Sequence, residues 1–331
     1  MKRSSELTYT PAWWVRGPHL QTLWGKFFRR KRIVATRAES WVTPDGDELE
    51  IQRLDATLPN APRVLILHGL EGTIKSHYLQ GMLGEIKRRG WAADVLIFRG
   101  CNGKQNLVQR MYHSGETTDV DFVARRLINE NPGQRLAFIG FSLGGNVLLK
   151  YLGELGQNHP APVSAAVAIS VPFDLERGSR HIETGFSRVY TRHFLRTLKR
   201  KAALKLAAYP HAFSKSKLEQ AKTLFEFDDA VTSPLHGFDG ASDYYHRSSS
   251  VHYISDIRLP TLLISARDDP FLPPSVLDTV AKVSRRSAYL LLEITHSGGH
   301  VGFVSGRNIL GPQYYAERRA VEFIGNQLTP T

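Results

Sequence analysis

The sequence predicts an α/β fold in which a mostly parallel central sheet carries helices on both faces. Short apolar, β-branched runs alternate with longer segments of helical periodicity along most of the 331 residues. Such alternation is typical of parallel strands joined by helices. With 42% hydrophobic and 22% charged residues the chain has the composition of a globular protein, and we expect a single domain over residues 1–331.

The expected elements follow in order along the chain. Residues 33–54 predict an opening hairpin that turns at Pro44-Asp45-Gly46. Further strands are expected at 64–67, 94–98, 136–140, 165–171, 261–265 and 289–294, and helices at 78–89, 117–130, 143–155, 274–283 and 314–328. Gly90 and Gly156 directly follow two of these helices, where glycine commonly ends a helix. Glu116 and Asp119 are expected to cap the helix over 117–130.

One segment departs from this alternation. Residues 174–257 contain no run of strand character and are basic, aromatic and helical in composition. We interpret them as a helical cap inserted over the carboxyl edge of the sheet. Loops at that edge hold the ligand site in such folds, so the cap would shape access of the substrate.

A candidate nucleophile lies between a predicted strand and a predicted helix. Gly140-Phe141-Ser142-Leu143-Gly144 has the G-x-S-x-G pattern in the strand-turn-helix context that this pattern requires. The turn would expose Ser142, and the N–H groups that begin the helix would face a developing oxyanion. The alternative is a purely structural turn, but the flanking elements favour a nucleophile.

A serine nucleophile needs a histidine that takes its proton and an acid that orients the histidine. In the chain order serine, acid, histidine, Asp268 and Asp269 follow the strand over 261–265, and His296 and His300 follow the strand over 289–294. We favour Asp269, because a Pro-Phe-Leu-Pro run follows it, and expect Asp268 to brace the turn. We favour His300, because the two preceding glycines can bend the backbone over the sheet, whereas His296 fits a half-buried structural residue.

A second backbone donor for the oxyanion is expected after the strand over 64–67. His68-Gly69-Leu70-Glu71-Gly72 has the H-G-x-x-G pattern, whose glycines allow the N–H of Leu70 to point inward beside that of Leu143. His68 is expected to brace this loop without transferring a proton, because His300 already supplies the base.

These motifs resemble the α/β-hydrolase fold family, and within it the AB-hydrolase-4 group of YheT-like esterases, which is related to the ABHD lipases. The resemblance covers nearly the whole chain and rests on PHLQTL (18–23), HGLEG (68–72), FRGC (98–101), YHSGET (112–117), GFSLGGN (140–146), DDPF (268–271) and GGHVGF (298–303). It implies a serine carboxylic-ester hydrolase with Ser142, Asp269 and His300 as the triad, and a cap between the sixth and seventh strands.

We therefore expect Ser142 to attack an ester carbonyl and form an acyl-enzyme intermediate, on short- to medium-chain acyl esters. No metal or organic cofactor is expected, since this chemistry needs none and no Cys/His cluster has zinc spacing. Two other interpretations stay open. One is a thioesterase or lysophospholipase with the same triad, and the other is a membrane-surface binding protein with a vestigial site.

The net charge of +12 is concentrated in two stretches, 26–37 and 184–217, which contain basic but no acidic residues. In the second stretch, basic residues recur every fourth position, while apolar residues fall on another side of the expected helix: Arg188, Arg192, Arg196 and Arg200 against Val189, Tyr190, Phe194, Leu198 and Ala202. Such a face fits contact with an anionic membrane surface or a solvated charged face. Nucleic acid is not expected as a partner, because no recognition module is present.

The location of the protein is predicted from its cysteine content and its first residues. Cys101 is the only cysteine, so it can form no internal disulfide and is expected to be a small packing residue. Residues 1–10 lack the apolar core of a signal peptide, and no run of about 18 apolar residues could span a membrane. These features predict a cytoplasmic protein.

Overall fold

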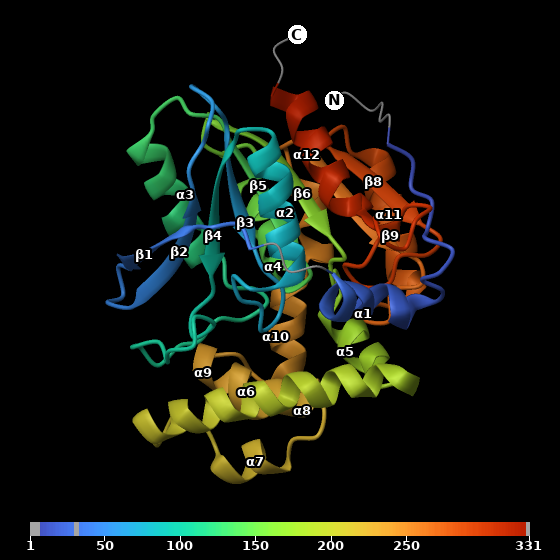
Figure 1. The fold of residues 1–331 in the computed structure, drawn as a ribbon. Coiled ribbons are helices and arrows are strands. Elements are labelled where there is room, and N and C mark those ends of the chain that lie inside the picture. Colours follow the sequence, from blue (N-terminus) through green and yellow to red (C-terminus); the bar gives the residue numbers. More distant parts are fainter. Residues whose placement is uncertain (1–6, 30–32, 329–331) are drawn as a thin grey trace.

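A computed structural model describes residues 7–29 and 33–328. Its central sheet has the strands β1 (Arg37–Val42), β2 (Glu48–Leu54), β3 (Arg63–Leu67), β4 (Ala92–Ile97), β5 (Leu136–Phe141), β6 (Val163–Ile169), β7 (Thr261–Ala266) and β8 (Leu290–Thr295). They lie in the order β1-β2-β4-β3-β5-β6-β7-β8 (Figure 1). The predicted hairpin β1–β2 is antiparallel, as is the β2–β4 pair, and the other pairs are parallel. The predicted α/β sheet is confirmed.

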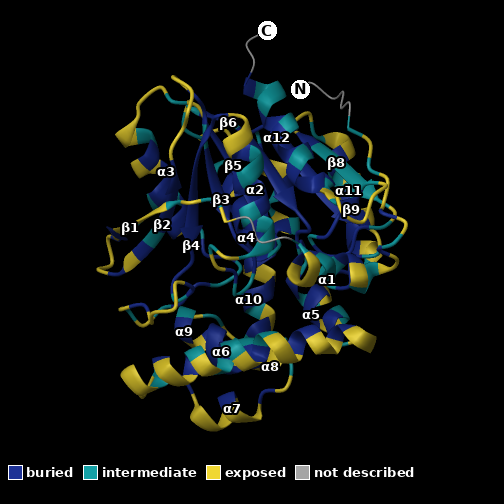
Figure 2. Cartoon of the chain, in the orientation of Figure 1, coloured by how far each residue is buried: buried dark blue, intermediate teal, exposed yellow. Residues whose placement is uncertain are grey.

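The central strands are buried on both faces. Every residue of β4, β5 and β7 is buried, as the dark blue strands of Figure 2 show. Burial on both faces explains why these strands are continuous apolar runs rather than alternating ones.

Two helical layers cover the sheet. α2 (His77–Arg88) and α12 (Tyr315–Leu328) contact each other in front of the sheet in Figure 1. α3 (Thr118–Glu130) and α4 (Leu143–Leu155) contact each other on the opposite side, and η4 (Ile254–Asp256) contacts both α4 and α11 (Pro274–Arg286). All five helices expected from the periodicity are present, with ends shifted by up to three residues.

The segment between β6 and β7 is helical, as predicted for residues 174–257. It contains α5 (Leu175–Ile182), η1 (Gly185–Ser187), α6 (Arg188–Ala208), α7 (Lys215–Gln220), α8 (Leu224–Phe227), the π-helical η2 (Asp228–Thr232), α9 (Ser233–His236), α10 (Ala241–Ser248), η3 (Ser250–His252) and η4. Figure 1 shows most of these helices as a separate layer below the sheet. We call residues 174–257 the helical insertion.

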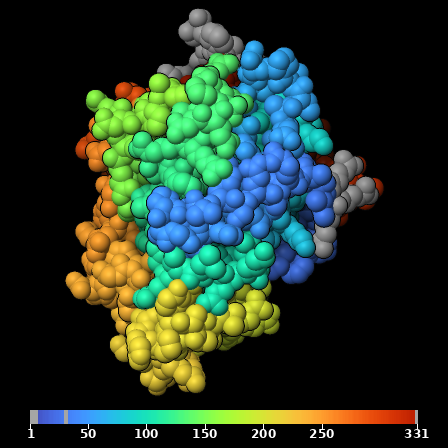
Figure 3. All heavy atoms as spheres, turned by 90° about the vertical axis from the view of Figure 1, so that its left-hand side faces the viewer, coloured from blue at the N-terminus to red at the C-terminus, as the bar shows by residue number. Residues whose placement is uncertain are grey.

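The helical insertion contacts the loops that follow the central strands. After β4, the chain lies against α6, where Lys205 Nζ donates to the carbonyl oxygens of Asn106 at 2.9 Å and Val108 at 2.7 Å. The Tyr209 hydroxyl donates to the Leu107 carbonyl at 2.6 Å. Figure 3 shows this side of the molecule, with the insertion in yellow below the body. These contacts place the insertion at the carboxyl edge of the sheet.

Helix α1 (Pro18–Phe28) was not among the expected helices. Its sequence is a weak helix former, because Gly25 lies in its interior. Long-range contacts hold it instead: Gln21 donates to the Val304 carbonyl at 3.3 Å and accepts the Val304 N–H at 2.8 Å. A Cβ at Gly25 would lie 2.4 Å from His77, so the glycine allows α1 to approach α2. Two short strands, β9 (Val304–Ser305) and β10 (Gln313–Tyr314), were also not expected.

Of the two residues expected to cap α3, Glu116 does so and Asp119 does not. Glu116 accepts the Thr118 N–H at 2.7 Å, as a cap would. Asp119 does not cap the helix, because both of its carboxylate oxygens accept hydrogen bonds of 2.7 Å from the buried guanidinium of Arg99. Arg99 also pairs with Asp47 at 2.7 Å, which joins the hairpin turn to α3. A buried charge needs such partners more than a helix end needs a cap.

Candidate active site

Ser142 lies on a sharp turn between β5 and α4, with φ 51° and ψ −121°. Positive φ is strained for a residue other than glycine. The neighbouring glycines allow the turn to form. A Cβ at Gly140 would lie 2.6 Å from the Gly144 carbonyl oxygen, and a Cβ at Gly144 would lie 2.5 Å from the His68 carbonyl oxygen. The predicted elbow therefore has the backbone that presents a serine at the carboxyl edge of the sheet.

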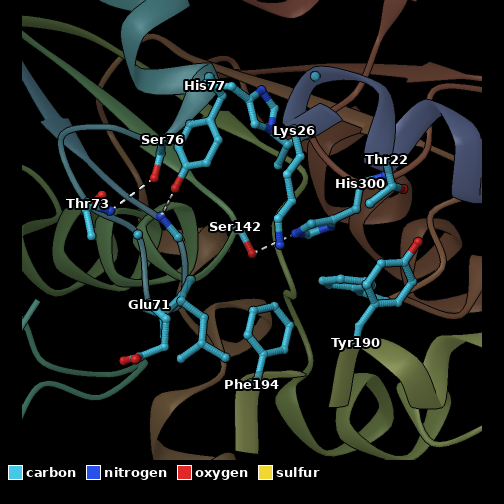
Figure 4. A pocket seen from close by; sticks show the side chains of 18 of the residues that line it. Thr22, Lys26, Glu71, Thr73, Ser76, His77, Ser142, Tyr190, Phe194 and His300 are labelled. Atoms are coloured by element: carbon cyan, nitrogen blue, oxygen red, sulfur yellow. Dashed lines mark hydrogen bonds between the residues drawn. The ribbon is translucent and has the colours of Figure 1, made fainter. Parts of the chain in front are cut away.

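The structure brings Ser142, His300 and Asp269 into one hydrogen-bonded chain. Ser142 Oγ lies 2.8 Å from His300 Nε2, and the two side chains face each other in Figure 4. His300 Nδ1 lies 2.9 Å from Asp269 Oδ2 and 3.1 Å from Oδ1. Both Asp269 and His300 are buried. An Nδ1–H that donates to the carboxylate leaves Nε2 free to accept the serine proton.

The alternatives that the sequence left open lie outside this chain. His296 is exposed at the end of β8. Asp268 Oδ1 accepts the Gly299 N–H at 2.9 Å, so Asp268 braces the loop that carries His300, as expected.

Residues from other segments of the chain hold His300 in place. Its N–H donates to Thr22 Oγ1 of α1 at 2.9 Å, and the Phe271 ring stacks on the imidazole at 4.0 Å. The Phe271 N–H also donates to Asp269 Oδ1 at 2.8 Å. The role of Thr22 was missed, although it lies in the run over 18–23 that contributes to the family resemblance.

The loop after β3 offers one unused backbone donor. In this loop the Gly72 N–H donates to the Gly69 carbonyl at 2.9 Å. The Gly69 N–H donates to the Tyr78 hydroxyl at 3.0 Å. The Glu71 N–H donates to the Tyr112 hydroxyl, also at 3.0 Å. Within the described chain, the Leu70 N–H has no acceptor, and neither has the Leu143 N–H at the start of α4. Both residues line the same cavity as Ser142.

His68 braces this loop as expected. Its Nε2 accepts the Phe98 N–H at 3.0 Å, so its Nδ1 carries the proton and donates to the Gly69 carbonyl at 2.7 Å. Burial lowers the pKa of His68 to about 4. A neutral histidine with both nitrogens engaged has no free position for proton transfer.

A cavity of about 1870 Å³ opens beside Ser142, between the body and the helical insertion. Its walls near Ser142 and His300 include three apolar or aromatic side chains of α6, namely Tyr190, Phe194 and Leu198. The polar groups of the triad therefore lie against a largely apolar surface of the insertion.

Among the described residues, no group of three or more His, Cys, Asp or Glu side chains could hold a metal ion. Cys101 is buried, and burial raises the pKa of its thiol to about 11, which fits its expected packing role. Within the described residues, no helix combines the length and hydropathy that a membrane crossing needs.

The two basic stretches of the sequence meet where α1 lies against the start of α6. Lys26 Nζ lies 3.4 Å from His193 Nε2, and His19 Nδ1 lies 3.2 Å from the Tyr190 hydroxyl. The arginines that recur at helical spacing are all exposed: Arg188, Arg192, Arg196 and Arg200. Arg30, Lys31 and Arg32 lie outside the described residues.

The expected two-sided pattern of α6 needs correction. Val189 was assigned to the apolar side but is exposed, because it lies seven and eleven positions before Arg196 and Arg200 and therefore on their exposed face of the helix. Lys205 is fully buried and bonds to carbonyls of the body, and Lys201 turns inward to Glu71. Lys201 and Lys205 of α6 therefore bind the body of the protein, whereas the arginines of the same helix face solvent.

The chain is similar to known proteins over most of its length. A family model described as "alpha/beta hydrolase fold" matches residues 62–306. The chain is 38% identical over 329 residues to "Putative esterase YheT" of Escherichia coli (strain K12), covering 98% of this chain and 95% of that one. It is 28% identical over 310 residues to "Phospholipase ABHD3" of Mus musculus, covering 90% and 74%. The solved structure of Pyrococcus furiosus esterase Pf2001 matches with a TM-score of 0.57 at 18% identity, covering 99% and 100%, which is a likeness of fold alone.

Proposed function

The chain belongs to the α/β-hydrolase fold family and is a carboxylic ester hydrolase, and we propose that it cleaves its substrate through Ser142, His300 and Asp269. One observation carries this assignment. The three side chains are joined by hydrogen bonds of 2.8 and 2.9 Å, and Ser142 and His300 line a cavity of about 1870 Å³.

In the proposed mechanism, Ser142 Oγ attacks the ester carbonyl carbon while His300 Nε2 takes the serine proton. The N–H groups of Leu70 and Leu143 stabilise the oxyanion of the tetrahedral intermediate. Collapse of this intermediate breaks the bond to the alcohol oxygen, which receives the proton from His300 and leaves an acyl group on Ser142. His300 then deprotonates a water molecule that attacks the acyl carbon. Collapse of this second tetrahedral intermediate breaks the bond to Ser142 Oγ, which takes the proton back from His300 as the acid is released. Asp269 orients His300 and stabilises its charged form.

We propose short- to medium-chain acyl esters as substrates and residues 174–257 as the cap of a single domain over 1–331. The apolar side chains that α6 contributes to the cavity support a binding role for an acyl chain. Thioesters and lysophospholipids are the alternative substrates, because they react through the same triad.

Labelling and a substrate series test this function. We expect a fluorophosphonate probe to react with the wild-type protein, with the adduct on Ser142 by peptide mass spectrometry. We also expect kcat/KM for p-nitrophenyl esters to be highest for butyrate or octanoate and to fall for palmitate. Higher kcat/KM for an acyl-CoA or for lysophosphatidylcholine would select an alternative substrate, and an adduct on another residue would overturn the assignment.

We further propose that the surface shared by α1 and the start of α6 contacts an anionic membrane. The aromatic side chains of Phe27, Phe28 and Phe186 are more than half exposed there, at 65%, 60% and 53%. Lys26 of the same helix α1 lies 3.4 Å from His193 of α6, and a combination of cations and aromatic rings suits the surface of an anionic bilayer. Lys26 and Phe28 also line the cavity, so this surface adjoins the active site.

Vesicle sedimentation tests the membrane contact. The double substitution Arg192→Glu/Arg196→Glu is expected to weaken binding to phosphatidylglycerol vesicles at least about tenfold, since each basic residue near such a surface contributes about 1 kcal/mol. Arg285→Glu/Arg286→Glu on α11 makes the same change of charge elsewhere and should have little effect. Equal loss in both variants, or equal binding to phosphatidylcholine vesicles, would contradict the proposal. Binding without any ester hydrolysis would favour a membrane-surface protein with a vestigial site.

A further inference from the structure

Glu71 occupies a backbone position that normally belongs to glycine. The Gly72 N–H donates to the Gly69 carbonyl at 2.9 Å, which closes a four-residue turn with Leu70 and Glu71 at its centre. Glu71 has φ 56°. Turns with positive φ at the second central residue favour Gly or Asn there, because a Cβ is strained in that conformation. A glutamate at this position therefore needs a reason beyond the turn itself.

The carboxylate of Glu71 is held by two side chains from different parts of the fold. Glu71 Oε1 accepts hydrogen bonds of 2.7 Å from the Tyr112 hydroxyl and of 2.7 Å from Lys201 Nζ. The Tyr112 hydroxyl also accepts the Glu71 N–H at 3.0 Å, so Tyr112 holds both the backbone and the side chain. The side chains of Glu71 and Lys201 are only 9% and 17% exposed, so solvent screens this ion pair weakly.

Lys201 belongs to α6 of the helical insertion, whereas Glu71 and Tyr112 belong to loops of the body. Its Nζ also lies 3.4 Å from Cys101 Sγ and 5.8 Å from the centre of the Tyr112 ring. In this cluster it is the one group supplied by the insertion. The position of α6 is thereby linked to the loop that carries Leu70.

The orientation of the Leu70 N–H depends on this loop. The Leu70 N–H and the Gly69 carbonyl belong to one planar peptide unit, so donors that hold the carbonyl also orient the N–H. The Gly72 N–H and His68 Nδ1 hold that carbonyl. The next peptide unit is held through the Glu71 N–H by Tyr112. Glu71 and its partners therefore restrain the backbone directly after the proposed oxyanion donor.

We propose that Glu71 and Lys201 are positioning residues for the oxyanion hole, through which the helical insertion sets the direction of the Leu70 N–H. This inference rests on the proposed function, because it assigns Leu70 as an oxyanion donor. When α6 lies against the body, Lys201 completes the cluster and the turn keeps its strained conformation. When the cluster is incomplete, the turn relaxes and the donor is misdirected.

Two variants test this inference. Lys201→Met removes the contact from the insertion, and Glu71→Gly removes the carboxylate while placing at this turn the residue that the backbone prefers. We expect each to lower kcat for p-nitrophenyl butyrate about tenfold or more, with KM within about twofold, because an oxyanion donor acts on the transition state. Relief of the positive-φ strain offsets part of the lost ion pair, so the melting temperature of Glu71→Gly should fall by no more than about 4 °C.

A transition-state analogue separates positioning from general damage. An alkyl trifluoromethyl ketone forms a hemiketal oxyanion on a serine hydrolase, so its inhibition constant should rise by the same factor as kcat/KM falls. Lys201→Arg should restore most of the activity. Lys199→Met removes a cation of α6 that bonds to the Glu219 carbonyl at the surface, and it should resemble the wild type.

The outcomes distinguish this inference from the proposed function. Unchanged kcat and unchanged ketone inhibition in Glu71→Gly and Lys201→Met, in a protein whose wild type is active, would overturn the positioning role alone. A loss of kcat in Glu71→Gly together with a large fall in melting temperature would also contradict it, because the effect would then come from folding. A wild-type protein that neither hydrolyses esters nor reacts at Ser142 would overturn the proposed function first.

Discussion

Ser142→Ala is expected to lower kcat/KM for p-nitrophenyl butyrate by about 10⁴–10⁶-fold, because alanine has no hydroxyl to form the proposed acyl-enzyme. Ser142 Oγ is the atom placed 2.8 Å from His300 Nε2, on a backbone strained to present it. Labelling by the fluorophosphonate probe should disappear in the same variant. The measurement is steady-state hydrolysis together with gel detection of the label.

His300→Ala should cause a loss of similar size, and the double variant should lose little more than either single one. Nucleophile and base act as one unit, so their effects do not add. His296→Ala provides the matched control, since His296 is the exposed histidine of the same loop. Retained activity in Ser142→Ala, or a large loss in His296→Ala, would contradict the triad assignment.

Asp269→Asn is expected to lower kcat by about 10⁴-fold with little change in the fold. The carboxylate accepts the Nδ1–H of His300 at 2.9 Å, and this bond selects the tautomer whose Nε2 can take the serine proton. An asparagine amide can donate to Nδ1 instead, which favours the unproductive tautomer. The expected result is a protein with the wild-type circular dichroism spectrum and melting temperature but almost no esterase activity.

Asp268→Asn is the control for this carboxylate. Asp268 Oδ1 accepts the Gly299 N–H at 2.9 Å, and the carbonyl oxygen of asparagine can accept the same bond. We expect its kcat to fall less than about tenfold, since the geometry of the loop is preserved. If Asp268→Asn were the more damaging of the two, the roles assigned to the adjacent carboxylates would have to be exchanged.

Local patterns predicted the body of the fold well. The strands β4, β5 and β7 are buried on both faces and therefore appear as continuous apolar runs, and α3, α4 and α11 follow them along the chain with helical periodicity. The order of elements then follows from the rule that parallel strands need helical connections. Helix α1 was not predicted, because it is held by hydrogen bonds between Gln21 and Val304, which are 283 positions apart in sequence.

In the candidate site too, local sequence patterns could not predict contacts between residues that are far apart in the chain. The motifs around Ser142, Asp269 and His300 are local, so their neighbours alone could favour Asp269 over Asp268 and His300 over His296. No local pattern indicated Thr22 as the acceptor of the His300 N–H, because those residues are 278 positions apart. No pattern separated Lys201 and Lys205, which turn inward, from the exposed arginines of the same helix.

The sequence by itself determined the alternation of strands and helices, the turn that carries Ser142 and the helical character of residues 174–257, because each depends on residues close together along the chain. The tertiary structure alone decided which side chains meet. Among the residues that the structure describes, it left the Leu70 N–H without a partner and occupied the N–H groups of Gly69 and Glu71 on either side. It also joined Lys201 to Glu71 across 130 positions. Hydrogen bonds and ion pairs act over a few ångströms in space, and only the folded chain defines that proximity.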